Sequence, residues 1–295
     1  MNIGRSCIGA TLLGLMLAAS AHAAPPATVA GIYALPDGKP QVSATLSVTA
    51  GVGAAAGAQM LDVAMARPGD ARPLTRYDVE LSKRLHVIAV SDDFRVFLHE
   101  HAGRPGADGH FRVSMRFPKG GTWHVYADAV PSGLGQQVMR FDISLDPGGT
   151  PPVGTPPPAA PQPTGLAGSD GRYGVRFDAL DLRAGQEAQL TLHVLRDGKP
   201  APDLAPFLGV AAHAVLISAA DLTYVHAHAA PVARGAVQHH GMAGMPGMDA
   251  PLPDARLPAD LVLHVTAPKA GTYLLWLQFS AGGHVRTVPF VVAAM

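Results

Sequence analysis

The sequence predicts an all-β protein, built as two tandem antiparallel immunoglobulin-like β-sandwich domains joined by a proline-rich linker. Short apolar segments recur between Gly, Pro and Asp residues, which is the pattern of strands separated by turns. After the first 23 residues no long segment has the 3.6-residue period of a helix. The two parts of the chain that flank the linker also repeat the same blocks in the same order, with about 110 residues in each copy, a length typical of such sandwiches.

Residues 1–23 have the composition of a secretory signal peptide. Arg5 precedes a short apolar run, and Ala21-His22-Ala23 offers a small-residue cleavage site. Cleavage after Ala21 is the alternative, and it would make His22 the first residue of the mature chain. The sequence therefore predicts an exported, periplasmic protein.

Composition excludes several classes of partner. The 22 basic and 22 acidic residues balance, so neither nucleic acid nor an anionic membrane surface is expected to bind. No segment of the mature form reaches the roughly 18 apolar residues of a membrane helix. The single cysteine, Cys7, lies within the signal peptide, so no thiol or disulfide is expected in the mature chain.

The linker is the stretch PGGTPPVGTPPPAAPQPTG, whose many prolines predict a semi-rigid spacer. We assign it to residues 147–168. The first domain then covers residues 24–146, with an irregular start to about residue 59, and the second covers residues 169–295.

Three blocks carry the internal repeat, and the first has the pattern H-x12-H-x-H in both copies. Agreement in order and spacing indicates a duplication. The matched pairs are LHVIAVSDDFRVFLHEH (85–101) with AHAVLISAADLTYVHAH (212–228), FPKGGTWHVYAD (117–128) with APKAGTYLLWLQ (267–278), and VMRFDIS (138–144) with HVRTVPF (284–290). In the second copy we expect strands at 189–195, 213–218, 222–228, 260–267, 271–279 and 285–292.

Each repeated histidine segment is predicted to form a hairpin. Two-residue turns at Asp92-Asp93 and Ala219-Ala220 would place the first two histidines opposite one another, with the third on the same face. Neutral imidazole binds copper, zinc or nickel. The candidate metal ligands are His86, His99 and His101 in the first copy and His213, His226 and His228 in the second. Alternatively these histidines lie at the rim of an apolar core and bond to the backbone, because Ile88 and Val90 share their face.

The second copy carries an insertion rich in histidine and methionine. His101 and Pro118 are 17 positions apart (118 − 101), whereas His228 and Pro268 are 40 apart (268 − 228), and the extra residues fall within 230–257. The insertion contains QHHGMAGMPGMDAP, whose candidate ligands are His239, His240, Met242, Met245 and Met248.

Thioethers in this insertion favour soft ions. Methionine prefers Cu(I) and, by the same argument, Ag(I), whereas histidine accepts either copper oxidation state. The interleaved glycines and proline do not allow a stable helix that would bury the methionines. We therefore expect copper, with Cu(I) favoured and Cu(II) or Ag(I) possible. The alternative is a low-complexity polar loop in which methionine is incidental.

The His/Met loop resembles the periplasmic copper-resistance proteins of the CopC and YtkA-like type. The resemblance covers His239, His240, Met242, Met245 and Met248 only, and it implies an immunoglobulin-like or cupredoxin-like copper carrier with a Met-rich Cu(I) site and a His-based Cu(II) site. An N-terminal histidine ligand of that family would exist here only if cleavage exposes His22, and the duplication and the linker are foreign to it. The FLHEH and YVHAH endings and the PKxGT block are also similar to uncharacterised exported bacterial proteins.

Three functions remain open from the sequence. The first is a copper carrier or copper-tolerance factor that exchanges its ion with a metal-donor or metal-acceptor envelope protein. The second is a non-catalytic tandem scaffold or interaction module without metal. A copper enzyme is the least supported, because a blue-copper site needs a cysteine that the mature chain lacks, so we expect no enzymatic activity. The oligomeric state is left open.

Overall fold

The computed structural model describes residues 27–51, 58–80, 82–145, 165–232 and 255–295. These residues are all-β and their sheets are antiparallel, which confirms the predicted class. None of the described segments forms a helix that could span a membrane. The signal peptide, the linker up to residue 164 and the ligands of the His/Met insertion lie outside the described residues.

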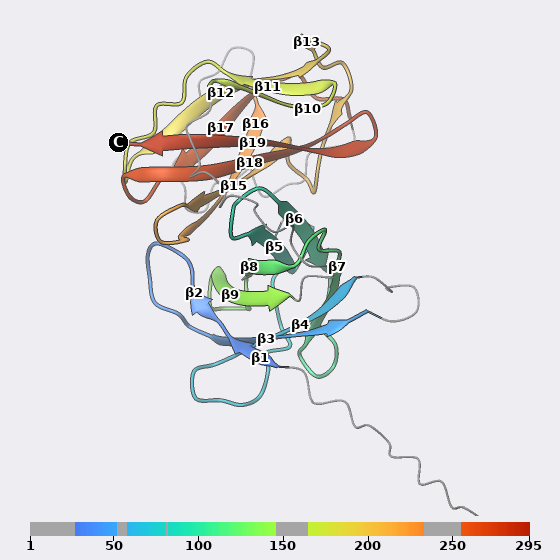
Figure 1. The fold of residues 1–295 in the computed structure, drawn as a ribbon, viewed down its shortest axis with the longest axis vertical. Coiled ribbons are helices and arrows are strands. Elements are labelled where there is room, and N and C mark those ends of the chain that lie inside the picture. Colours follow the sequence, from blue (N-terminus) through green and yellow to red (C-terminus); the bar gives the residue numbers. More distant parts are fainter. Residues whose placement is uncertain (1–26, 52–57, 81, 146–164, 233–254) are drawn as a thin grey trace, which may run out of the picture.

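The N-terminal half, residues 28–145, has two sheets with a core between them (Figure 1). Their orders are β1-β3-β4-β7 and β2-β9-β8-β5-β6. Leu46, Leu61 and Phe111 of the first sheet pack against Trp123 and Phe141 of the second. The strands are β1 (Thr28–Ala30), β2 (Ile32–Tyr33), β3 (Ser43–Ala50), β4 (Gln59–Ala66), β5 (Leu85–Ser91), β6 (Phe97–Ala102), β7 (Phe111–Met115), β8 (Gly121–Ala129) and β9 (Gln137–Leu145).

The C-terminal half, residues 167–294, forms one ten-stranded sheet around a second core. Its order is β10-β11-β12-β17-β16-β15-β18-β14, with β13 beside β12 and β19 beside β18. The sheet curls so that β10 at one end lies against β19 at the other. The contact is close: a Cβ atom added to Gly168 of β10 would lie 2.8 Å from the Val288 side chain of β19. The strands are β10 (Ala167–Asp170), β11 (Tyr173–Phe177), β12 (Glu187–Arg196), β13 (Lys199–Pro200), β14 (Leu204–Ala205), β15 (Ala212–Ser218), β16 (Tyr224–Pro231), β17 (Asp260–Thr266), β18 (Gly271–Ala281) and β19 (His284–Ala294).

A third apolar cluster joins the two halves. Strands β5 and β15 are buried at every position, because one face of each enters the core of its own half and the other meets the opposite half. Phe97 stacks on Trp276 with ring centroids 5.0 Å apart, and Tyr126 stacks on Tyr224 at 5.2 Å. Figure 1 shows β5 and β6 of the lower half facing β15 and β18 of the upper one. This cluster fixes the two histidine hairpins relative to one another.

The predicted strands of the second copy correspond to β12, β15, β16, β17, β18 and β19. The insertion lies between two strands as expected, because β16 ends at Pro231 and β17 begins at Asp260. Residues 28–50 contain more strand than the expected irregular start, since β3 pairs with both β1 and β4.

The third repeat block needs a correction in its alignment. Val125 faces Phe141 on β9, and the equivalent Leu275 faces Phe290 on β19. Phe141 therefore corresponds to Phe290, three positions beyond the residue that the sequence match assigned. Buried aromatic side chains, which fill the core, decide this register rather than the shared arginine.

Candidate metal centre

The two histidine hairpins have four-residue loops, so the predicted register was wrong. His86 lies opposite His101, and His213 lies opposite His228. Hydrogen bonds from Ser91 N to Val96 O and from Ser218 N to Thr223 O close the loops, at 3.1 and 3.0 Å.

Side chains of the loops explain why the turn is longer than predicted. Ser91 Oγ donates to Asp93 Oδ1, and Ser218 Oγ accepts from the backbone N–H groups of Ala220 and Asp221. Such local bonds stabilise loops that lack the Asn-Gly or Asp-Gly pair of a two-residue turn. The register moves by two residues, an even number, so the histidines stay on one face.

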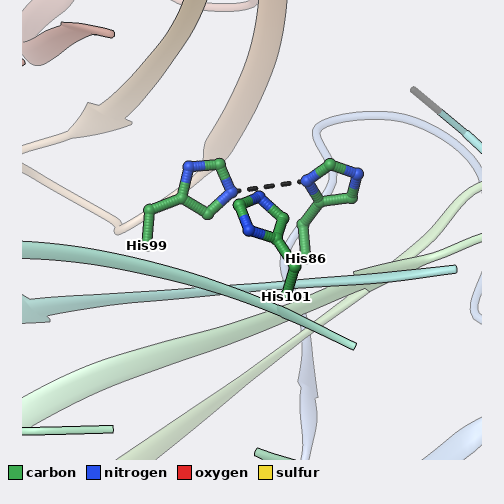
Figure 2. A group of neighbouring side chains, drawn as sticks. All are labelled: His86, His99 and His101. Atoms are coloured by element: carbon green, nitrogen blue, oxygen red, sulfur yellow. Dashed lines mark hydrogen bonds between the residues drawn. The ribbon is translucent and has the colours of Figure 1, made fainter. Parts of the chain in front are cut away.

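His86, His99 and His101 form what we call the N-terminal triad. His86 Nδ1 and His99 Nε2 are 3.3 Å apart, and one ring nitrogen from each of the three residues lies within 4.8 Å of the others. His101 Nε2 is buried and has no hydrogen-bond partner. Figure 2 shows the three rings turned toward one another above the strands.

His213, His226 and His228 form the C-terminal triad, which repeats this geometry. His213 Nδ1 and His226 Nε2 are also 3.3 Å apart, and the three ligand nitrogens again lie within 4.8 Å of one another. His228 Nε2 is buried without a partner, as His101 Nε2 is. The sequence correctly grouped the histidines of each copy, although by the wrong pairing.

In four of the six histidines, the ring nitrogen that does not face another histidine of its triad donates a hydrogen bond to an oxygen atom. His86 Nε2 donates to the Glu80 carbonyl oxygen at 3.3 Å, and His213 Nε2 donates to the Phe207 carbonyl oxygen at 3.0 Å. His99 Nδ1 donates to Gln278 Oε1 at 2.6 Å.

The fourth of these bonds runs from His226 Nδ1 to Asp128 Oδ2 at 3.1 Å. A neutral imidazole has one donor and one acceptor nitrogen. When these rings are neutral, the first two rings of each triad therefore point lone pairs at each other across 3.3 Å. Facing lone pairs repel unless a cation lies between them.

In the N-terminal triad, protonation does not supply that cation near pH 7. Burial, with the charge of His226 as the next cause, lowers the pKa of His86 to about 4. Burial also lowers the pKa of His101 and of His228 to about 3. The pKa values of His99 and His213 lie well below the ordinary value, again mainly because of burial. These five rings are neutral at pH 7, which is the form that binds metals.

Two acids lie beside the histidines, the buried Asp128 and the half-buried Glu80. Burial would raise the pKa of Asp128, but the hydrogen bond from His226 and the charge on that ring hold it below the ordinary value. Asp128 also accepts from Tyr224 OH and from Gln136 Nε2. Burial, and then the charge of Asp128, raises the pKa of Glu80 to about 7, and Glu80 Oε2 is buried without a partner.

The triads lie next to each other across the interface between the halves. Ring centroids of His86 and His226 are 5.5 Å apart, and those of His86 and His213 are 6.3 Å apart. His99 and His213 are separated by 6.4 Å. Six histidines from β5, β6, β15 and β16 thus form one group, in which His86 and His213 are buried and the other four are half-buried.

The sequence missed the polar partners of the triads. Asp128 and Gln278 occupy the same final position of the second repeat block, in FPKGGTWHVYAD and APKAGTYLLWLQ. Polar residues repeated at the end of two buried strands were the available signal. Glu80 and Phe207 act through their backbone carbonyls, for which the sequence carries no signal.

Four further histidines bond to carboxylates outside the triads. His110 bonds to Asp62, His124 to Asp92 and Asp142, His193 to Asp178 and Asp260, and His264 to Glu187. None of these four histidines was among the predicted metal ligands. The predicted ligands His239, His240, Met242, Met245 and Met248 lie outside the described residues.

Fold and site together define an all-β protein with two partly buried three-histidine clusters at the interface between its two halves. Residues 167–295 are similar to a domain of unknown function, DUF8832. This match includes the C-terminal triad and Gln278, but not the N-terminal triad. Among curated proteins, none matches the chain.

Proposed function

We propose that this protein binds transition metal ions in its two histidine triads and carries copper as its cargo. It would act as a periplasmic copper carrier or copper-tolerance factor, released from the signal peptide 1–23. Its architecture would be two tandem immunoglobulin-like domains separated by the linker 147–168. The observation that carries the proposal is the pair of imidazole nitrogens that face each other at 3.3 Å in both triads.

The surroundings of the triads support a metal rather than a packing role. Histidines that bind metals usually donate their second ring nitrogen to a carboxylate or a carbonyl, and four of these six do so. His101 Nε2 and His228 Nε2, buried and without partners, would supply the third ligand of each site. A hydrogen-bonded core histidine would not leave that nitrogen unsatisfied.

The ligand set supports copper over other ions. Three neutral imidazoles bind copper, zinc or nickel, and copper(II) binds such ligands most tightly among the divalent ions of the first row. The methionines of the insertion, Met242, Met245 and Met248, add soft ligands that favour Cu(I). Three protein ligands leave a coordination position open, through which an envelope protein could deliver or accept the ion by ligand exchange.

An anaerobic titration of the mature, metal-free protein with Cu(I) against a competing chromophoric chelator tests the proposal. The wild type is expected to bind at least two ions per chain, and H101A/H228A is expected to lose the tight sites. M242L/M245L/M248L is expected to lose only the additional Cu(I) capacity.

H193A is the matched control, because His193 pairs with Asp178 and Asp260 away from the triads. It should bind as the wild type does. Parallel titrations with Cu(II) and Zn(II) identify the preferred ion. If the wild type binds no ion stoichiometrically, the metal proposal fails and a tandem scaffold becomes the better account.

A further inference from the structure

We infer that the two triads form one paired metal centre. Each half supplies three ligands to its own ion. Each half also supplies one orienting group, a hydrogen-bond acceptor that holds a ligand histidine of the other half in place. The inference rests on the proposed function, because it requires that the triads bind metal. Asp128 of the N-terminal half orients His226, and Gln278 of the C-terminal half orients His99.

Proximity is the first argument for a paired centre. The closest rings from different triads, His86 and His226, have centroids 5.5 Å apart. This distance is similar to the spacing within a triad, where His213 and His226 are 5.6 Å apart. Two ions bound to these rings would therefore interact with each other electrostatically and magnetically.

Exchange of the orienting groups is the second argument. Asp128 and Gln278 hold equivalent places, since Asp128 faces His86 on β5 and Gln278 faces His213 on β15. Each nevertheless bonds to the histidine of the opposite half rather than to one of its own. Neither half alone contains a triad with all of its bonds.

The amide of Gln278 is fixed in its orientation. Gln278 Nε2 donates to Thr287 Oγ1 at 2.9 Å, which turns Oε1 toward His99 Nδ1. Asp128 is fixed by bonds from Tyr224 and Gln136 in addition to His226. Both orienting groups are thus held in place before any ion binds.

The two sites are expected to differ in the oxidation state of copper that they prefer. A carboxylate bonded to a ligand histidine increases the basicity of that ligand and offsets the charge of the ion. His226 has such a carboxylate in Asp128, whereas His99 has a neutral amide. The C-terminal triad should therefore prefer Cu(II) over Cu(I) more strongly than the N-terminal triad does.

Electron paramagnetic resonance of the full mature chain, loaded with two equivalents of Cu(II), tests the pairing. The expected spectrum shows spin coupling between two copper ions. H99A/H101A and H226A/H228A, each with one triad left, should bind one ion and give the spectrum of isolated Cu(II). Circular dichroism verifies that these variants keep the β-fold.

The outcomes separate the two proposals. Two bound ions without spin coupling would overturn the paired centre and leave the proposed function intact. Absence of stoichiometric binding would overturn the proposed function and the paired centre with it.

A second experiment tests the exchanged orienting groups. In the H99A/H101A background, D128N is expected to weaken Cu(II) binding by the C-terminal triad about 10- to 100-fold, although Asp128 belongs to the other half. In the H226A/H228A background, Q278E is expected to strengthen Cu(II) binding by the N-terminal triad. D178N, which removes an exposed partner of His193, is the matched control.

Q278E keeps the test decisive if D128N does not fold, because the expected result is a gain of affinity. Unchanged Cu(II) affinity in Q278E, or in a folded D128N, would overturn the assignment of orienting groups across the interface.

Discussion

The two halves of the molecule build the same histidine triad on different sheet arrangements. In the N-terminal half β6 and β7 belong to different sheets, whereas in the C-terminal half β16 pairs with β17 and joins all strands into one sheet. The triad geometry is nevertheless alike, because the facing nitrogens of the first two rings are 3.3 Å apart in both halves. The hairpin and its contact with the opposite half, rather than the surrounding sheet, therefore determine the triad.

The halves differ most in the polar group that each gives to the other. Asp128 carries a charge and Gln278 does not, although both end the same repeat block. The aromatic stacks differ in the same way, because Tyr224 has a hydroxyl that reaches Asp128 and its counterpart Phe97 has none. The two halves thus share the ligands and differ in the surroundings of those ligands, and four predictions test this comparison.

Among the substitutions, the largest expected effect is on the aromatic stacks between the halves. Trp276→Ala removes the ring that stacks on Phe97 and should lower the free energy of unfolding by about 3–5 kcal/mol. Tyr126→Ala, at the equivalent place, should cost a similar amount because Tyr126 is fully buried against Tyr224. Urea denaturation measures both. A loss below about 1 kcal/mol in either variant would show that its stack does not hold the halves together.

Acidification should also destabilise the metal-free protein. In the unfolded chain histidine titrates near pH 6.5, whereas burial lowers the pKa of His86 to about 4 and that of His101 and His228 to about 3. Between these values the unfolded state binds more protons, so stability falls as the pH falls. At about 1.4 kcal/mol per unit, His86 alone accounts for about 3 kcal/mol.

Glu80 acts with the opposite sign. Its pKa is raised to about 7, so it adds stability below its unfolded value and loses that contribution as the pH rises through 7. Five histidines outweigh this one acid, and thermal melts from pH 7 to pH 4 should show a falling melting temperature. A melting temperature that is constant or rises over this range would contradict the burial of neutral rings.

Much of the fold could be predicted because strand patterns and repeats are local or periodic signals. The histidines of each triad share one face for any even shift of register, so a wrong turn length still grouped them correctly. The meeting of the two triads could not be predicted. It depends on the burial of both faces of β5 and β15. Their apolar sequences, LHVIAVS and AHAVLIS, do not indicate which element covers the second face.

Removal of the Tyr224 hydroxyl should weaken Cu(II) binding at one of the two triads only. Tyr224 OH donates to Asp128 Oδ2 at 3.1 Å, and Phe97 offers no such bond. Tyr224→Phe should lower the free energy of unfolding by about 1–3 kcal/mol, since the bond is to a buried charged group. It should also weaken Cu(II) binding by the C-terminal triad without changing the N-terminal triad, as titrations of the single-triad variants would reveal. Equal weakening of both triads would mean that the sites are not distinguished by Asp128.

The smallest expected effect is a gain of stability at the cost of metal binding. His101 Nε2 and His228 Nε2 are buried without partners, and such groups destabilise a folded protein. His101→Leu and His228→Leu should therefore each stabilise the metal-free protein, by about 1 kcal/mol, and abolish tight binding at their own triad. Chemical denaturation with and without Cu(II) separates the two effects. Loss of stability in the metal-free variants would indicate that these histidines serve packing, whereas a gain of stability together with loss of Cu(II) binding would show that the chain keeps them for the ion and not for stability.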